Sequence, residues 1–147
     1  MPRHRRFEKK KAQTLKPGEW TSLEFTSVVD ADRGGEATGS LYSLVGVNEK
    51  DGALYDFSVG VTIAGLSDGA EVQIRATEYG PDGAGGWEYA RNRPVDSPVH
   101  AGGNGHFTYT WKGSLAKGRR VRVRLIQHGD TDASVTSATS DVFYWPK

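Results

Sequence analysis

The side chains that most often do chemistry in proteins are sparse along this 147-residue chain. Four histidines are present without metal-ligand spacing, and a site built from His100, His106 and an acid would need a hairpin to assemble it. Cysteine is absent, which excludes thiolate catalysis, disulfides and cysteine-based metal centres. No Gly-x-Ser-x-Gly sequence marks a serine nucleophile. We therefore expect no enzyme activity, no metal and no cofactor.

The acids and the glycine-rich tract have explanations that involve no catalysis. Most aspartates lie in predicted turns, where turn formation and solubility account for them. Two carboxylates that meet in a cleft would make a glycosidase, which is the weakest of the functions considered. The tract at 80–86 lacks the Gly-Lys-Ser/Thr ending of a phosphate loop and predicts a hairpin tip.

The residues suited to binding begin with a basic N-terminal segment. Residues 1–16 hold seven Lys/Arg against one acid, a net charge of +6, whereas the rest holds 12 Lys/Arg and 17 Asp/Glu, a net charge of −5. This asymmetry predicts an acidic partner. The basic arm spans residues 1–18. We expect its residues 1–16 to have no fold of their own and to dock on a neighbouring protein, with Phe7 as the apolar anchor. The predicted docking residues are Arg3, Arg5, Arg6, Phe7, Lys9, Lys10 and Lys11.

Two further groups are candidate ligand or interface residues. Trp87 and Tyr89 follow the glycine-rich tract on one strand face, where they either stack on a sugar or protein partner or pack beneath the loop. Arg120, Arg122 and Arg124 share the polar face of one predicted strand. They either pair with acids on a neighbouring strand or face another subunit.

Two-residue alternation predicts the elements that position these groups. The clearest predicted strands are 54–63, 72–77, 106–111, 120–125 and 142–145, and the less regular ones are 21–28, 39–47, 86–91 and 134–139. A turn is predicted at 66–69 from its Asp-Gly pair. The predicted core residues are Tyr55, Phe57, Val59, Val61, Ile63, Val72, Ile74, Val121, Val123 and Leu125.

Many short strands with regular turns and no amphipathic helix predict an all-β fold, an antiparallel two-sheet sandwich of the jelly-roll type. The length suits one domain, at 19–147, which follows the basic arm at 1–18. The N-terminus has no apolar segment of the secretory type, so we expect synthesis in a host cytoplasm without a signal peptide.

The segment 52–59 (GALYDFSV) resembles the Gly-x-Tyr-x-Phe-x-Val strand of C1q/TNF-like jelly rolls, with one extra residue. The segments 107–111, 115–123 and 138–145 are similar to later strands of that family in order and spacing, so the likeness covers 20–147. The chain departs from the pattern in its Trp-Pro-Lys ending and in having no collagen-like stalk. The resemblance implies a jelly roll that associates as a trimer.

Small cysteine-free proteins of this kind also resemble virion proteins of bacteriophages, and the Gly/Ala/Arg/Asp/Val-rich composition suits a high-GC host. The leading hypothesis is a non-enzymatic virion protein, a capsid decoration or minor tail component, that docks through the basic arm and displays the sandwich outside. The alternative is a carbohydrate-binding module that uses Trp87 and Tyr89 to reach a host-surface glycan. Nucleic-acid binding is less favoured, because the acidic body would repel phosphate. No membrane partner is expected.

Overall fold

The computed structural model describes residues 3–30, 35–46, 52–81, 83–84, 87–93, 95 and 98–147. All regular elements in these residues are β-strands, and the named strands pair only in antiparallel fashion. This confirms the predicted all-β sandwich. In chain order the strands are β1 (Arg3–Lys9), β2 (Gln13–Leu15), β3 (Thr21–Ser22), β4 (Phe25–Asp30), β5 (Gly35–Leu41), β6 (Ser43–Gly46), β7 (Ala53–Pro81), β8 (Trp87–Asn92), β9 (Val99–Leu115), β10 (Arg120–Gln127) and β11 (Ala133–Pro146).

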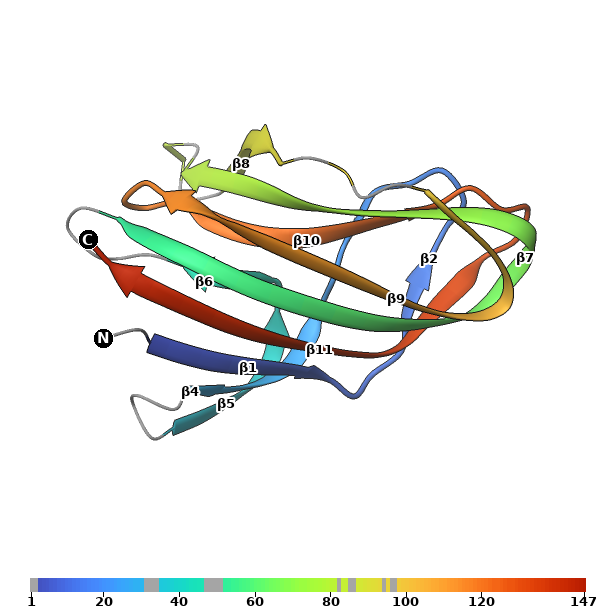
Figure 1. The fold of residues 1–147 in the computed structure, drawn as a ribbon, viewed down its shortest axis with the longest axis horizontal. Coiled ribbons are helices and arrows are strands. Elements are labelled where there is room, and N and C mark those ends of the chain that lie inside the picture. The colour runs from blue at the N-terminus through green and yellow to red at the C-terminus, as the bar shows by residue number, and fades with distance from the viewer. Residues whose placement is uncertain are drawn as a thin grey trace.

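The longest strand, β7, contributes to both layers because it folds back near its middle (Figure 1). Gly65 and Gly69 have φ values of +79° and +71° at this bend, a region that favours glycine. The predicted turn at 66–69 lies at this bend. The strands 54–63 and 72–77 are therefore the two halves of one bent strand.

The two layers share β7 and β9. Sheet 1 has the order β5-β4-β1-β11-β7-β9 and uses the first half of β7. Sheet 2 uses the second half of β7, with β10 and then β3 and β6 on one side, and β8 and the beginning of β9 on the other. Each sheet therefore has one face toward the core and one outer face.

The core lies between the two sheets and is built by alternation. The ten predicted core residues are all buried, and none is more than 3% exposed. These residues occupy alternate positions of β7 and β10, so the residues between them face outward. Alternation thus determines which arginines of β10 reach the surface.

The basic arm is not a separate flexible segment. Its strand β1 lies inside sheet 1, paired with β11 over seven residues and with β4 over four, as Figure 1 shows. The expectation that residues 1–16 have no fold of their own is therefore wrong. The alternation in β1 is concealed because basic residues occupy three of its four core-side positions, Arg3, Arg5, Phe7 and Lys9.

Candidate functional site

Phe7 is a core residue of this chain. It is 3% exposed, and its ring centroid lies 5.5 Å from that of Phe25. The expectation that Phe7 is the apolar anchor for a partner is corrected by this burial, because the ring already fills a position in the chain's own core. Its function in this structure is to hold β1 in sheet 1.

Two basic side chains of β1 are engaged within the chain. Arg6 Nη1 lies 3.3 Å from Asp141 Oδ2 on the neighbouring strand. Lys9 is 4% exposed, and its Nζ donates to the backbone oxygen of Glu24 at 2.8 Å. Burial is the main cause that lowers the pKa of Lys9. Lys9 is therefore buried within the chain, whereas Arg6 stays exposed beside an acidic neighbour.

The remaining basic residues predicted for docking divide into two groups. The guanidinium carbons of Arg3 and Arg5 lie 6.0 and 5.1 Å from the ring centroid of Tyr144. Lys10 and Lys11 follow β1 and are exposed. Docking on an acidic partner stays a prediction, and the exposed lysines are the residues best placed for it.

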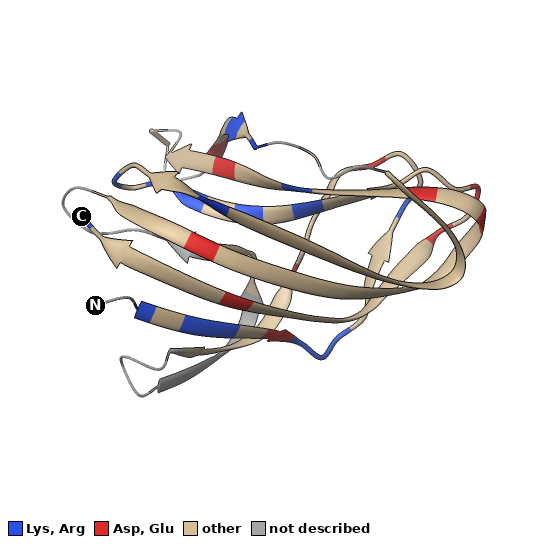
Figure 2. Ribbon diagram, viewed as in Figure 1, with Lys and Arg blue, Asp and Glu red and all other residues tan. Residues whose placement is uncertain are grey.

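A second basic surface lies on the outer face of sheet 2. Arg120, Arg122 and Arg124 of β10 lie on this face as predicted, and Figure 2 shows the basic bands along the strand. Arg75 of β7 lies directly opposite Arg124. Arg120 is exposed, whereas Arg75, Arg122 and Arg124 are half-buried. We call these last three residues the arginine face.

Aromatic rings hold the arginine face in place. The guanidinium of Arg75 lies 3.9 Å from the ring centroid of Trp20, whose backbone oxygen accepts a hydrogen bond from Arg124 Nη2 at 2.9 Å. The guanidinium of Arg122 lies 4.6 Å from the ring centroid of Tyr79. Cation–π contacts of this kind fix a guanidinium without neutralising it.

Among the described residues, no carboxylate oxygen lies within 4.0 Å of a guanidinium nitrogen of the arginine face, which is the distance of an ion pair. The ring centroid of Tyr42 lies 5.5 Å from the guanidinium carbon of Arg122, and the Tyr42 hydroxyl donates a hydrogen bond to Glu24 at 3.0 Å. Burial lowers the pKa of Arg75, and the charge of Arg124 lowers it further. Like charges directly opposite on neighbouring strands are destabilising. The alternative in which the β10 arginines pair with acids therefore does not apply to Arg122 and Arg124.

Neutral polar groups and one exposed ring border the arginine face. Tyr89 is 57% exposed on β8, the strand next to the second half of β7. The side-chain amide of Asn92 lies 3.0 Å from Thr77 Oγ1, and its oxygen accepts from Arg75 Nη1 at 3.1 Å when the amide is oriented to satisfy both neighbours. Trp87 pairs with Pro81 through its backbone, and its side chain lies outside the described part of the structure.

A buried carboxylate that the sequence did not reveal lies beneath the edge of sheet 2. Glu78 has 0% exposure and contacts three guanidinium groups. Arg91 Nε donates to Glu78 Oε2 at 2.8 Å, Arg93 Nη2 donates to Oε1, and Arg119 Nη1 lies 3.6 Å away. The cluster ties β8 and the turn before β10 to β7, which is a structural role.

The outer face of sheet 1 is different in character, because large apolar side chains are exposed on it. Leu54 and Trp145 lie directly opposite each other on β7 and β11 and are 49% and 39% exposed. Phe143, two residues before Trp145 and therefore on the same face, is 42% exposed, and its ring stacks on His4 with centroids 4.6 Å apart. Sequence reasoning missed this surface, since these residues alternate with core residues that are equally apolar.

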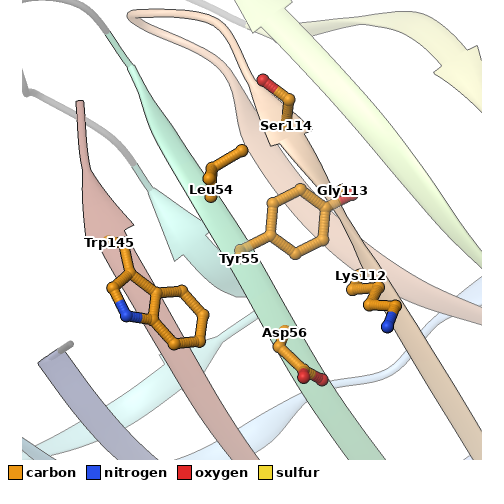
Figure 3. Close-up of a pocket in the computed structure, with 7 residues that line it drawn as sticks. All are labelled: Leu54, Tyr55, Asp56, Lys112, Gly113, Ser114 and Trp145. Atoms are coloured by element: carbon orange, nitrogen blue, oxygen red, sulfur yellow. The ribbon is translucent and has the colours of Figure 1, made fainter.

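A groove of about 670 Å³ follows this apolar surface toward the edge strand β9 (Figure 3). Asp56 of β7 and Lys112 of β9 are directly opposite each other, and both line it. The full lining is Leu54, Tyr55, Asp56, Lys112, Gly113, Ser114 and Trp145. An apolar centre with a polar margin is the composition of a protein interface.

The described residues were also considered for a metal site and for a membrane-spanning helix. They contain no group of three His, Cys, Asp or Glu residues that could hold a metal ion. They also contain no helix of the length and hydropathy needed to cross a membrane.

Comparison with known proteins finds similarity in fold alone. No family model matches the sequence, and no curated protein matches it. Among solved structures, a chain of infectious bursal disease virus, Gx strain, aligns with 97% of this chain at a TM-score of 0.50 and 11% identity. A chain of the Gt strain aligns with 99% of it at a TM-score of 0.52 and 8% identity.

These similarities define the class of fold, a jelly-roll-like β-sandwich of a kind found in viruses. The chain spans about a third of the length of the viral chains that it matches, 32% and 34%. None of the comparisons supports the resemblance to C1q/TNF-like modules in particular.

Proposed function

We propose that this chain is a non-enzymatic structural protein of a virion, specifically a bacteriophage capsid decoration or minor tail component, and that its copies associate through the outer face of sheet 1. The fold similarity to virus chains supports the virion role. The bacteriophage origin is a finer part of the proposal, and the Gly/Ala/Arg/Asp/Val-rich composition of the chain supports it. The position on the particle is a further part of the proposal.

The observation that carries the self-association is the exposed apolar surface of sheet 1. Leu54, Phe143 and Trp145 form one continuous group across β7 and β11, beside the groove toward β9. Contiguous apolar surface on a soluble domain marks an interaction site, because leaving it in water costs free energy that association recovers. A copy of the same chain suits the surface, since a virion part is present in many copies. The proposed assembly is a trimer.

The assembly is tested by light scattering coupled to size-exclusion chromatography. We expect the wild-type chain to run at three times its 16.0 kDa mass. Leu54→Lys should place a charge in the interface and yield monomers. The matched control is Val99→Lys, because Val99 is 48% exposed but lies outside the apolar surface. A monomeric wild type at high concentration, or equal behaviour of the two variants, would contradict the proposed interface.

The virion role needs a separate measurement. Mass spectrometry of purified particles of the encoding virus should detect the chain in a fixed ratio to the other particle proteins. Absence of the chain from particles, with the chain present in the lysate, would contradict the role irrespective of the oligomeric state.

A further inference from the structure

We propose that the arginine face binds an acidic glycan, a polysaccharide whose sugar rings carry carboxylate groups. This inference goes beyond the virion role. It concerns the outer face of sheet 2, so it is also independent of the apolar surface on sheet 1.

The first argument is electrostatic. Arg75 and Arg124 are directly opposite each other, and Arg122 follows two positions along β10. Within the described residues none of the three forms an ion pair with a carboxylate. Their Nε atoms are also buried without a hydrogen-bond acceptor there. A chain under no other constraint would avoid this repulsion, and a bound anion removes it.

The second argument is the geometry of the guanidinium groups. Successive outward positions on an antiparallel strand are about 6.8 Å apart, so Arg122 and Arg124 present two donor groups in a row. A guanidinium offers paired N–H donors that match the two oxygens of a carboxylate. The rings of Trp20 and Tyr79 hold the guanidinium groups of Arg75 and Arg122, so little side-chain entropy is lost on binding.

The third argument is the neutral border of the face. Sugar rings need hydroxyl and amide partners and an apolar ring to pack against, in addition to any charge contact. Exposed Asn92 supplies an amide beside Arg75, and the buried hydroxyl of Thr77 holds that amide in place. Tyr89, at 57% exposure, supplies an open ring. This combination is absent from a surface that recognises charge alone.

The charge of the rest of the molecule favours a glycan over a nucleic acid. Residues 17–147 include the arginine face and still have a net charge of −5. A nucleic acid has one phosphate per nucleotide and would be repelled beyond the face. Many acidic glycans carry fewer charges along their length, so a short stretch satisfies the arginines with less repulsion elsewhere.

Isothermal titration calorimetry on the full chain tests the proposal. The probe is a short hyaluronan oligosaccharide, in which every second sugar carries a carboxylate, and its methyl ester is the matched ligand that keeps the sugars and removes the charge. We expect the ester to bind at least about tenfold more weakly, and the Arg122→Gln/Arg124→Gln variant to lose affinity for the acid form by at least about tenfold. The control Lys16→Gln/Lys117→Gln removes the same charge at two exposed lysines outside the arginine face and should bind like wild type.

Three results would overturn the proposal. An oligothymidylate of equal charge that binds more tightly than the glycan would assign the face to nucleic acid. Equal affinity for the acid and its ester would exclude carboxylate recognition, and unchanged affinity in the double arginine variant would place the ligand elsewhere. Tyr89→Ala, at an exposed position, provides a second variant and is expected to weaken binding of the acid form without a loss of fold.

Discussion

Phe7→Ala is the sharpest test of the place of β1 in the fold. Replacing a buried phenylalanine with alanine costs about 3–5 kcal/mol, and an aromatic pair such as Phe7–Phe25 adds to the loss. The strand is held by ladders on both sides, so the cavity cannot close by collapse. We therefore expect a loss of about 4 kcal/mol, near the middle of that range. For a chain of this length the melting temperature should fall by about 13 °C.

The matched control is Phe143→Ala, the same substitution on the neighbouring strand β11 at 42% exposure. Its cost should stay below about 1.5 kcal/mol, because much of the ring is already in water. Urea denaturation followed by tryptophan fluorescence measures both, at two chain concentrations because Phe143 lies in the proposed interface. Equal small losses for the two variants would refute the reasoning and restore a flexible arm.

Three other substitutions have expected outcomes. Glu78→Gln should lower the free energy of unfolding by about 2–3 kcal/mol in urea denaturation, because the mostly buried guanidinium of Arg93 loses its counter-charge. The other two arginines of the cluster reach solvent and lose less. The control Glu88→Ala, at an exposed position, should cost under about 0.5 kcal/mol. Gly52→Ala should lower the melting temperature, because Gly52 has a φ of +84° and a Cβ there would lie 2.1 Å from a backbone oxygen. The control Gly80→Ala should change the melting temperature far less, because a Cβ at Gly80 would meet open space. Burial raises the pKa of Tyr55 above 10.0, so the unfolded chain loses the hydroxyl proton at a lower pH than the folded chain does. The free energy of unfolding should therefore fall as the pH rises above 10.0. The same fall in the Tyr55→Phe variant would contradict this.

Alternation predicted the layers of the fold well because a strand with one buried face must repeat every two residues. The segments at 54–63, 72–77 and 120–125 carry that repeat with apolar residues at every inward position, and the structure buries all ten predicted core side chains. The segment at residues 3–9 carries the same repeat but satisfies it with Arg, Phe and Lys. The long stems of Arg5 and Lys9 face inward while their charged groups reach Tyr144 and a backbone oxygen.

The sequence predicted only part of the arginine face, because spacing within one strand does not show which residues lie on the neighbouring strands. Spacing within β10 placed three arginines on one face, but it carried no information about which residues stand opposite them. The register that sets Arg75 against Arg124, and the contact of Trp20 with Arg75, join segments that are far apart in the chain. Pairing between strands depends on the whole fold, so such neighbours become known only from the structure.

Part of the basic charge of the N-terminal segment is engaged within sheet 1. Net charge predicted that the first sixteen residues would seek an acidic partner, yet Arg6 meets Asp141 within the same sheet and Lys9 is buried. Lys9 is not accessible to a partner, whereas Arg6, Lys10 and Lys11 are exposed and docking through them stays a prediction. The arginine face holds fewer positive charges than the arm, but they lack carboxylate partners in the described structure. Recognition of an anion should accordingly depend on Arg75, Arg122 and Arg124 more than on the N-terminal cluster.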